Sequence, residues 1–277
     1  MGPIIGSDDI ILSGANTTSD EGAGSFPVRV LGRGRMGSAL AGALGAAGWK
    51  VDLVGGRGPH VAGSTDGVAL LVVCVPDAAV ADVAAEVRPN PAGDTVVAHC
   101  AGALTLDVLK PHTRRASLHP LVAVPRGIAG PAALRGAWMA LAGDPAVEVP
   151  AAALGARTFR VADEHRVAYH ASAVIAANHL VALLGQAERV AGGAGVPAEA
   201  IMALAQGALA GAARVGATEA LTGPVARGDW GTIAAHLAAL APDERSTYEA
   251  LALQALRLAW PTIWAATDEG SAPPWRS

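Results

Sequence analysis

Hydrophobic and polar positions follow two different patterns on the two sides of residue 160. From Pro27 onward, short apolar runs bounded by Gly, Pro or Asp alternate with stretches in which apolar residues recur every three or four positions. The short runs predict strands and the longer stretches predict helices. Strands that alternate with helices indicate a parallel sheet covered on both faces. The predicted strands are Val28–Leu31, Val51–Val54, Val68–Val75, Thr95–Ala98, Ala116–Leu118 and Trp138–Ala142, and the predicted helices are Met36–Gly48 and Ala78–Val87.

After Arg160 the strand pattern stops and long Ala- and Leu-rich stretches follow, separated by Gly and Pro breakers. These stretches predict helices over residues 162–192, 198–215, 229–240 and 243–265. The predicted organisation is a flexible N-terminal extension over residues 1–26, an α/β domain over 27–160 and an all-α domain over 161–277. The last residues, SAPPWRS, are expected to fray.

Composition and charge narrow the class of protein. With 52% hydrophobic and 16% charged residues, the chain has ample material for a folded core. A net charge of −4 argues against a nucleic-acid partner and against an anionic membrane surface. The two cysteines form no disulfide framework and no metal-ligand spacing, so we expect no metal and a reducing compartment. The most apolar long stretch, Val167 to Leu184, carries histidines and an asparagine that are costly in hydrocarbon, so a soluble cytoplasmic protein is expected.

A glycine-rich turn joins the first predicted strand to the first predicted helix. Its sequence, Gly32-Arg33-Gly34-Arg35-Met36-Gly37, is G-x-G-x-x-G. In such a turn the first glycine permits a tight bend, the second lets a pyrophosphate approach the backbone, and the third lets helix and strand pack closely. The alternative is a chance match in a chain that holds 34 glycines. The strand and helix on either side favour a Rossmann domain that binds a dinucleotide.

The end of the second predicted strand indicates which dinucleotide. An NAD site usually places an acidic residue there for the ribose 2′-hydroxyl, but this strand ends in Gly-Gly-Arg-Gly, and Asp52 comes too early. Arg57 is placed to bind a 2′-phosphate, although it could be a solvated loop arginine. The sequence therefore predicts NADP(H). Val75 and Pro76, which close the third strand, are expected beside the cofactor or in an ordinary turn.

Two histidines follow later strands of the predicted sheet. His99 and Cys100 follow the fourth strand and His119 follows the fifth. Because ligands bind outside the carboxyl ends of the strands in open α/β sheets, these residues are candidates for the cofactor and substrate site. Each could equally be polar surface, and the sequence identifies no partner that would activate Cys100.

The first long helix of the second half carries polar groups in an apolar setting. His170 and Asn178 lie eight residues apart, which is about 80° around an α-helix and two turns along it, so they are expected to share a face and hold one small substrate. They could instead bond across an interface. Farther on, Thr222, Gly223, Pro224 and Arg227 form a loop in which the arginine could bind a carboxylate. Asp229 is expected to cap the next helix.

The motifs VLGRGRMG, VVCVPD, HCAGAL, SLHPL, YHASAVIAANHLVAL and LTGPVARGDW together resemble the "Rossmann-like and DUF2520 domain" proteins. These are relatives of the ketopantoate reductase and pyrroline-5-carboxylate reductase group. The resemblance covers Pro27 to about Leu251. It implies an N-terminal NADP-binding Rossmann domain and a C-terminal helical domain like that of 6-phosphogluconate dehydrogenase, and it implies a homodimer through the helical domain.

The resemblance also implies roles for particular residues. Ketopantoate reductases carry a catalytic lysine eight residues before an asparagine that matches Asn178, so His170 occupies the place of that lysine. The His-Pro of SLHPL is similar to the His-Pro motif of prephenate dehydrogenases, in which the histidine contacts substrate, and this makes His119 a second candidate. A histidine can replace lysine as a proton donor, since its ordinary pKa suits acid–base chemistry.

The expected function is the NADPH-dependent reduction of a carbonyl or imine in a small carboxylate-bearing substrate. By kinship, a ketopantoate-like 2-oxo acid is the best guess. His170 would donate the proton, Asn178 would orient the substrate, and Thr222 or Arg227 would hold its carboxylate. The alternative is an NADP(H)-binding sensor without turnover, which the missing lysine favours. The sequence leaves open the substrate, the direction of reaction and the choice between His119 and His170.

Overall fold

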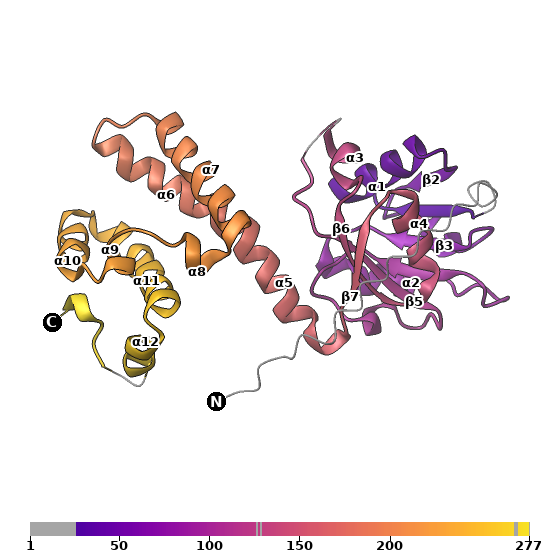
Figure 1. Ribbon diagram of the computed structural model, residues 1–277. Coiled ribbons are helices and arrows are strands. Elements are labelled where there is room, and N and C mark those ends of the chain that lie inside the picture. Colours follow the sequence, from indigo (N-terminus) through magenta and orange to yellow (C-terminus); the bar gives the residue numbers. More distant parts are fainter. Residues whose placement is uncertain (1–25, 126, 128, 269–270, 277) are drawn as a thin grey trace. The chain divides into compact units, whose positions relative to one another are not determined.

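The computed structural model describes residues 26–125, 127, 129–268 and 271–276. Except for Phe26, the predicted N-terminal extension lies outside these described residues. The chain forms two compact units, the first running to Ala177 and the second beginning at Asn178 (Figure 1). The sheet is complete at Arg160, the end of its last strand, and the helical turns that follow it pack with the first unit.

The first unit contains a seven-stranded sheet in the order β2-β1-β3-β4-β5-β6-β7. Neighbouring strands are parallel except for β5 and β6. All six predicted strands are found, with β1 and β2 at their predicted bounds, and the predicted α/β fold is confirmed. The edge strand β7 is additional. The strands are β1 (Val28–Leu31), β2 (Val51–Val54), β3 (Leu70–Val73), β4 (Val96–His99), β5 (Arg115–Pro120), β6 (Trp138–Gly143) and β7 (Arg157–Arg160).

Helices cover both faces of this sheet. The larger core cluster joins Val30 and Val72 of the strands to Leu40 and Leu44 of α1 (Arg35–Ala46), and it includes residues of α3 (Ala129–Leu134) and α4 (Glu148–Ala153). The opposite face packs against α2 (Val80–Glu86). Burial on both faces explains why β3 and β4 are continuous apolar runs rather than alternating ones. Each fully buried Val or Leu side chain contributes about 1.5–3 kcal/mol.

The strand order creates one topological switch. From β1 the chain crosses through α1 to β2 on one side, and it then returns past β1 to β3 on the other side. The carboxyl ends of β1 and β3 therefore open a crevice between connections that run in opposite directions, which is where open α/β sheets bind ligands. The glycine-rich turn lies at this point.

A helical run leads from the sheet into the second unit. It comprises a 3₁₀ turn at Asp163–His165, α5 (Arg166–Val174), a π-helical turn at Ile175–His179 and α6 (Leu180–Gly193). The second unit continues with α7 (Ala198–Val215), α8 (Ala217–Ala220), α9 (Pro224–Arg227), α10 (Trp230–Ala239), α11 (Pro242–Ala259) and α12 (Pro261–Asp268). The prediction of one helix over 243–265 is wrong, because the chain leaves helical geometry at Trp260 and Pro261 begins a new helix.

The core of the second unit gathers around two tryptophans. Val225, Ile233 and Leu256 pack with Trp275, and Trp230 lies against this cluster. The predicted fraying of the tail is wrong, since Trp275 is buried and Arg276 forms an ion pair with Glu249 at 2.5 Å. By contrast, α7 has no buried residue although it lies beside α6 (Figure 1).

The helical run Asp163–Gly193 is long and apolar enough to pass the length and hydropathy test for a membrane span, which we did not expect. None of its most apolar window is buried in the protein. One such helix is weak evidence for a membrane, because an apolar helix that packs against other protein has the same composition.

Candidate functional site

Two glycines of the turn are required by the fold itself. Gly32 has a φ of +126°, and a Cβ there would lie 2.5 Å from the carbonyl oxygen of Cys74. A Cβ at Gly37 would collide with the carbonyl of Gly32. The turn is further fixed by hydrogen bonds from the Gly32 N–H to Val54 and from the Cys74 N–H to Leu31, at 2.9 and 2.8 Å. These contacts bring the ends of β1, β2 and β3 together.

Gly34 differs from both of these glycines. Its backbone has an ordinary φ of −71°, and the nearest atom to an added Cβ would be the Cys74 oxygen at 3.9 Å. Packing within the chain therefore does not require glycine at this position, whereas a ligand that approaches the backbone would. No side chain caps the N-terminus of α1, so its first N–H groups are available to an anion. The turn fits a pyrophosphate.

The end of β2 supplies an unpaired cation. Arg57 is exposed and makes no hydrogen bond or ion pair with any described residue, and the same holds for Arg35. Asp52, by contrast, is bound to Arg29 at 2.7 Å, in keeping with the prediction that it does not serve a ribose. The loop of Arg57 lies close to the turn, since a Cβ on Gly56 would lie 2.6 Å from Val75. The arrangement fits a 2′-phosphate at Arg57.

The other residues predicted to hold the cofactor occupy different environments. Met36 and Val75 are half-buried, whereas Arg33 and Pro76 are exposed. His99 is fully buried and its Nδ1 accepts a hydrogen bond from the Ala101 N–H at 3.2 Å. Burial, together with the nearby charge of Arg166, lowers the pKa of His99 to about 4. This imidazole is therefore neutral at physiological pH, and it shapes the loop after β4.

Cys100 is buried beside the other cysteine of the chain. The Sγ atoms of Cys74 and Cys100 are 3.3 Å apart, and neither cysteine is in a disulfide. The hydrogen bond between them and burial raise the pKa of the Cys74 thiol. A buried thiol with a raised pKa is a poor nucleophile, so the pair is part of the interior beneath the glycine turn.

A second group of polar side chains lies at the ends of β4 and β5, where α5 begins. Nδ1 of His119 and the Tyr169 hydroxyl are 2.6 Å apart. The rings of His119 and His170 are in edge-to-face contact, with their centroids 6.0 Å apart. Gly102 lies beside both rings, since a Cβ there would lie 3.0 Å from Nε2 of His119 and closer still to His170. The structure thus brings together His119 and His170, which were predicted independently, and adds Tyr169.

Arg166 lies beneath this group and has no exposed surface. Its guanidinium donates hydrogen bonds to the carbonyl oxygens of Leu104 and Ala101, at 2.5 and 3.1 Å, and to the Ser117 hydroxyl. The nearest carboxylate, that of Asp163, is 3.9 Å away. Arg166 therefore ties α5 to the loop that carries Gly102 and to the strand that carries His119.

Burial and positive neighbours determine the protonation of the group. Burial, followed by the charges of His170 and Arg166, lowers the pKa of His119 to about 4. Burial raises the pKa of Tyr169 to about 12, although the charge of Arg166 acts in the opposite direction. Near neutral pH the imidazole of His119 is therefore uncharged and the phenol of Tyr169 is protonated.

The remaining predicted residues belong to the second unit. Asn178 is exposed and lies in the π-helical turn. The π turn changes the helical phase between Asn178 and His170, and their predicted role in holding one substrate stays a prediction. Thr222 and Arg227 are exposed, Gly223 precedes α9 with a φ of +92°, and Pro224 is its first residue. Their roles in substrate binding stay predictions. Asp229 caps α10 as predicted, accepting from the Thr232 N–H at 3.2 Å.

Sequence reasoning missed Tyr169 and Arg166. The available signal was spacing: Arg166 stands three residues before Tyr169 and four before His170, which places the three on one face of a helix. An arginine in such an apolar stretch needs hydrogen-bond acceptors if that face is buried.

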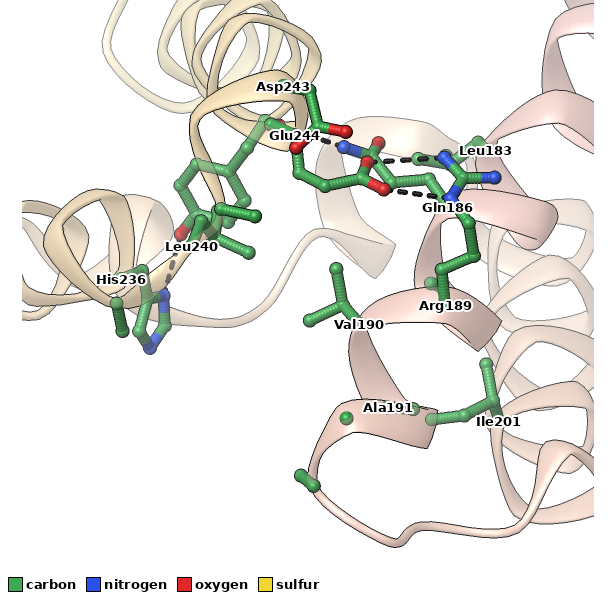
Figure 2. A pocket seen from close by; sticks show the side chains of 16 residues that line it. Leu183, Gln186, Arg189, Val190, Ala191, Ile201, His236, Leu240, Asp243 and Glu244 are labelled. Atoms are coloured by element: carbon green, nitrogen blue, oxygen red, sulfur yellow. Dashed lines mark hydrogen bonds and ion pairs between the residues drawn. The ribbon is translucent and has the colours of Figure 1, made fainter.

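A cavity of about 870 Å³ lies within the second unit, between α6, α10 and α11 (Figure 2). Its polar groups bond to one another: Arg189 pairs with Glu244 at 2.8 Å, and His236 meets the Tyr248 hydroxyl at 2.7 Å. The rest of the lining is mainly apolar. No sequence motif predicted this cavity.

Comparison with known proteins agrees with this architecture. Residues 142–255 match the family model of the domain of unknown function DUF2520, so the predicted resemblance is confirmed. No curated protein matches the chain.

Several solved structures share the fold. BF3122 from Bacteroides fragilis, described as an NADP oxidoreductase, has a TM-score of 0.67 and 18% identity over 83% of this chain and 97% of its own. TM1727 from Thermotoga maritima has a TM-score of 0.65 and 23% identity over 84% and 98%. A reductive aminase from Aspergillus terreus, solved with NADPH and ethyl levulinate, has a TM-score of 0.64 and 16% identity over 89% and 99%.

The buried histidines predict a loss of stability in mild acid. The ordinary pKa of histidine, 6.5, is lowered to about 4 at His99 and His119 in the folded protein. Above pH 6.5 both forms are neutral and the stability is complete. As the pH falls from 6.5 toward 4, the unfolded chain takes up protons that the folded chain refuses, so the free energy of unfolding falls by up to about 2 kcal/mol per histidine between pH 7 and 5.

Urea unfolding at pH 7 and pH 5 measures this loss. His99→Asn keeps an acceptor for the Ala101 N–H but does not titrate, so its stability should change less with pH than that of the wild type. An equal pH dependence in both proteins would show that His99 is not the source.

Proposed function

We propose that the protein is an NADPH-dependent oxidoreductase that reduces a carbonyl or imine in a small carboxylate-bearing substrate, with a ketopantoate-like 2-oxo acid as the leading candidate. The observation that carries the proposal is the glycine turn. The space beside Gly34 is open, although the fold does not require a glycine at this position. It lies beside the uncapped N-terminus of α1 and the unpaired Arg57. The shared fold with BF3122 and with the NADPH-bound reductive aminase supports the same function.

The chain's own residues would divide the work. The backbone of Gly32 to Gly37 would bind the pyrophosphate, and Arg57 would bind the 2′-phosphate with its planar guanidinium. The bound cofactor supplies the hydride. His119 lies near the end of β5 and His170 lies against it on α5, where they would supply the hydrogen-bond donor that a reacting carbonyl needs. Both cysteines are free, as in the reducing cytoplasm where we place the protein.

Arg57→Ala tests the choice of cofactor. The variant should lose roughly 10- to 100-fold in NADPH affinity, because a charged hydrogen-bond pair is removed, while NADH affinity changes little. Isothermal titration calorimetry with each dinucleotide measures both affinities. Arg135→Ala, at another exposed arginine of the first unit, serves as the control. Equal losses for NADPH and NADH would contradict the 2′-phosphate assignment.

Turnover tests the reaction itself. The wild-type protein should oxidise NADPH, followed by its absorbance, with at least one member of a panel of 2-oxo acids and cyclic imines. His170→Ala should abolish this turnover while NADPH affinity stays within a few-fold, because His170 lies at the reacting end of the site. His165→Ala, at an exposed histidine one turn earlier, should remain active.

The outcomes separate the candidate functions. Full activity in His170→Ala would remove this residue from the mechanism. Tight NADPH binding without turnover across the panel would favour the cofactor-binding sensor over the enzyme.

We also propose that the helical unit forms a homodimer. None of the residues of α7 is buried, and its Leu204 is 71% exposed. Val181 on the neighbouring α6 is 69% exposed. A second copy that covers these side chains would bury apolar surface that water now contacts.

Light scattering should give twice the chain mass of 27.5 kDa for the wild type. Leu204→Glu should give monomers, because a charge in the interface is costly. Val149→Glu, at an exposed position of α4, should remain a dimer. A monomeric wild type, or a dimeric Leu204→Glu, would overturn the proposed interface.

A further inference from the structure

The chain contains two tyrosines, and each hydroxyl meets Nδ1 of a histidine. The pair His236–Tyr248 lies in the second unit and its hydrogen bond is exposed. The pair His119–Tyr169 lies in the group above Arg166 and is partly buried. The two pairs are chemically alike and differ in their surroundings, so one is a natural control for the other.

The geometry makes His119 a bridge. Its Nδ1 is engaged with the Tyr169 hydroxyl at 2.6 Å. Its other nitrogen, Nε2, makes no hydrogen bond with any described residue and lies at the surface of Gly102, beside His170. One ring thus connects a phenol on one side with a free ring nitrogen on the other. If the phenol donates to Nδ1, neutral imidazole carries its own hydrogen on Nε2.

The charges around this bridge exclude the simplest proton donor. Arg166, His170, His99 and Tyr169 are the titratable or charged groups that face His119. Burial, followed by the charges of His170 and Arg166, keeps the imidazole of His119 uncharged. The imidazolium form of His119 is therefore not available near neutral pH. The phenol is the nearest acidic O–H, and the charge of Arg166 favours its ionised form against the effect of burial.

We propose that a proton reaches the substrate from Tyr169 through His119. This inference rests on the proposed reductase function. As the substrate carbon is reduced, the Nε2–H bond of His119 breaks and the substrate oxygen or nitrogen gains that proton. In the same step Nδ1 takes the proton of the Tyr169 hydroxyl, so His119 changes tautomer without becoming charged. The negative charge that reduction brings to the substrate ends on the phenolate, next to Arg166. The phenolate then takes the proton back from Nδ1 while Nε2 takes a proton from water, which restores the starting tautomer and releases hydroxide to the solvent.

In this scheme His119 is the catalytic residue, because it touches the reacting atoms. Tyr169 is a positioning residue that acts through it. The transfer is energetically accessible, since an alkoxide is a far stronger base than a phenolate even when the phenol has a pKa of about 12. Gly102 leaves open the space beside Nε2 of His119 where the substrate would bind, and any side chain at this position would fill that space.

The test compares Tyr169→Phe with Tyr248→Phe. Phenylalanine keeps the ring that packs edge-to-face against Phe159, so the first variant retains its packing. Tyr169→Phe should lower kcat about 100-fold or more, with KM and NADPH affinity within a few-fold. The wild-type kcat should stay level between pH 6 and 9, whereas kcat of the variant should fall as pH rises, because its proton must come from solvent or buffer acids. Tyr248→Phe should match the wild type in each respect.

A second measurement needs neither substrate nor cofactor. Nitrogen-15 NMR of the ligand-free protein should show His119 as the neutral tautomer protonated on Nε2, and this preference should weaken in Tyr169→Phe alone. A hydrogen on Nδ1 in the wild type would overturn the relay even if no substrate were found. Wild-type kcat with a level pH profile in Tyr169→Phe would overturn it as well. Absence of NADPH turnover in the wild type would refute the reductase function separately, leaving the tautomer to decide the relay.

Discussion

The guanidinium of Arg166 lies in the interior of the first unit, where oxygen atoms accept hydrogen bonds from its Nε and Nη2 while its Nη1 has no partner among the described residues. Two loop carbonyls and the Ser117 hydroxyl accept its hydrogen bonds, and the carboxylate of Asp163 lies farther out. Removing such a group would leave these acceptors unpaired in a place that water does not reach. The ends of β4 and β5 and the start of α5 are therefore joined by one side chain. That junction holds the loop of Gly102, the strand of His119 and the helix of His170 together.

The same charge governs the chemistry of the group. A buried cation disfavours a second cation beside it and favours an anion. Together with burial and the charge of His170, it keeps His119 neutral, with Tyr169 as the hydrogen-bonding partner of His119. An arginine that contacts no ligand can in this way decide which of its neighbours holds the mobile proton.

The sequence was informative where one local pattern determined the structure. β1 and β2 and the helix α7 were predicted to the residue, because uniform periodic runs ended there at Gly, Pro or polar residues. The three-residue turns and the four-residue α9 were missed, since such short segments have no period of their own. The edge strand β7 was missed because its sequence, RTFR, has only one apolar residue and its ends are exposed. The π-helical turn at Ile175–His179 could not be foreseen, because nothing in an Ala-rich run marks where an extra residue enters.

The candidate site, like the fold, was predictable only where the signal lies in neighbouring residues of the chain. The glycine turn and Arg57 follow from neighbouring residues in the chain, His119 followed from its place after a strand, and His170 followed from its spacing to Asn178 on a predicted helix. The partnership of His119 with Tyr169 joins residues fifty positions apart, and no local rule contains it. Arg166 was overlooked for the same reason, because its acceptors lie on segments that only the folded sheet brings near it.

The three glycines of the turn are constrained by different contacts, two by the chain itself and one by a ligand. Gly32 and Gly37 are held by the chain's own backbone, so any descendant that still folds must keep them. The fold does not constrain Gly34 in this way, and only a bound molecule in contact with its backbone would exclude a side chain there. A lineage that abandoned its nucleotide could therefore drift at the middle glycine while conserving the outer two. Substitution at Gly34 alone, with Gly32 and Gly37 retained, would therefore indicate a relative that keeps the fold but no longer binds the coenzyme.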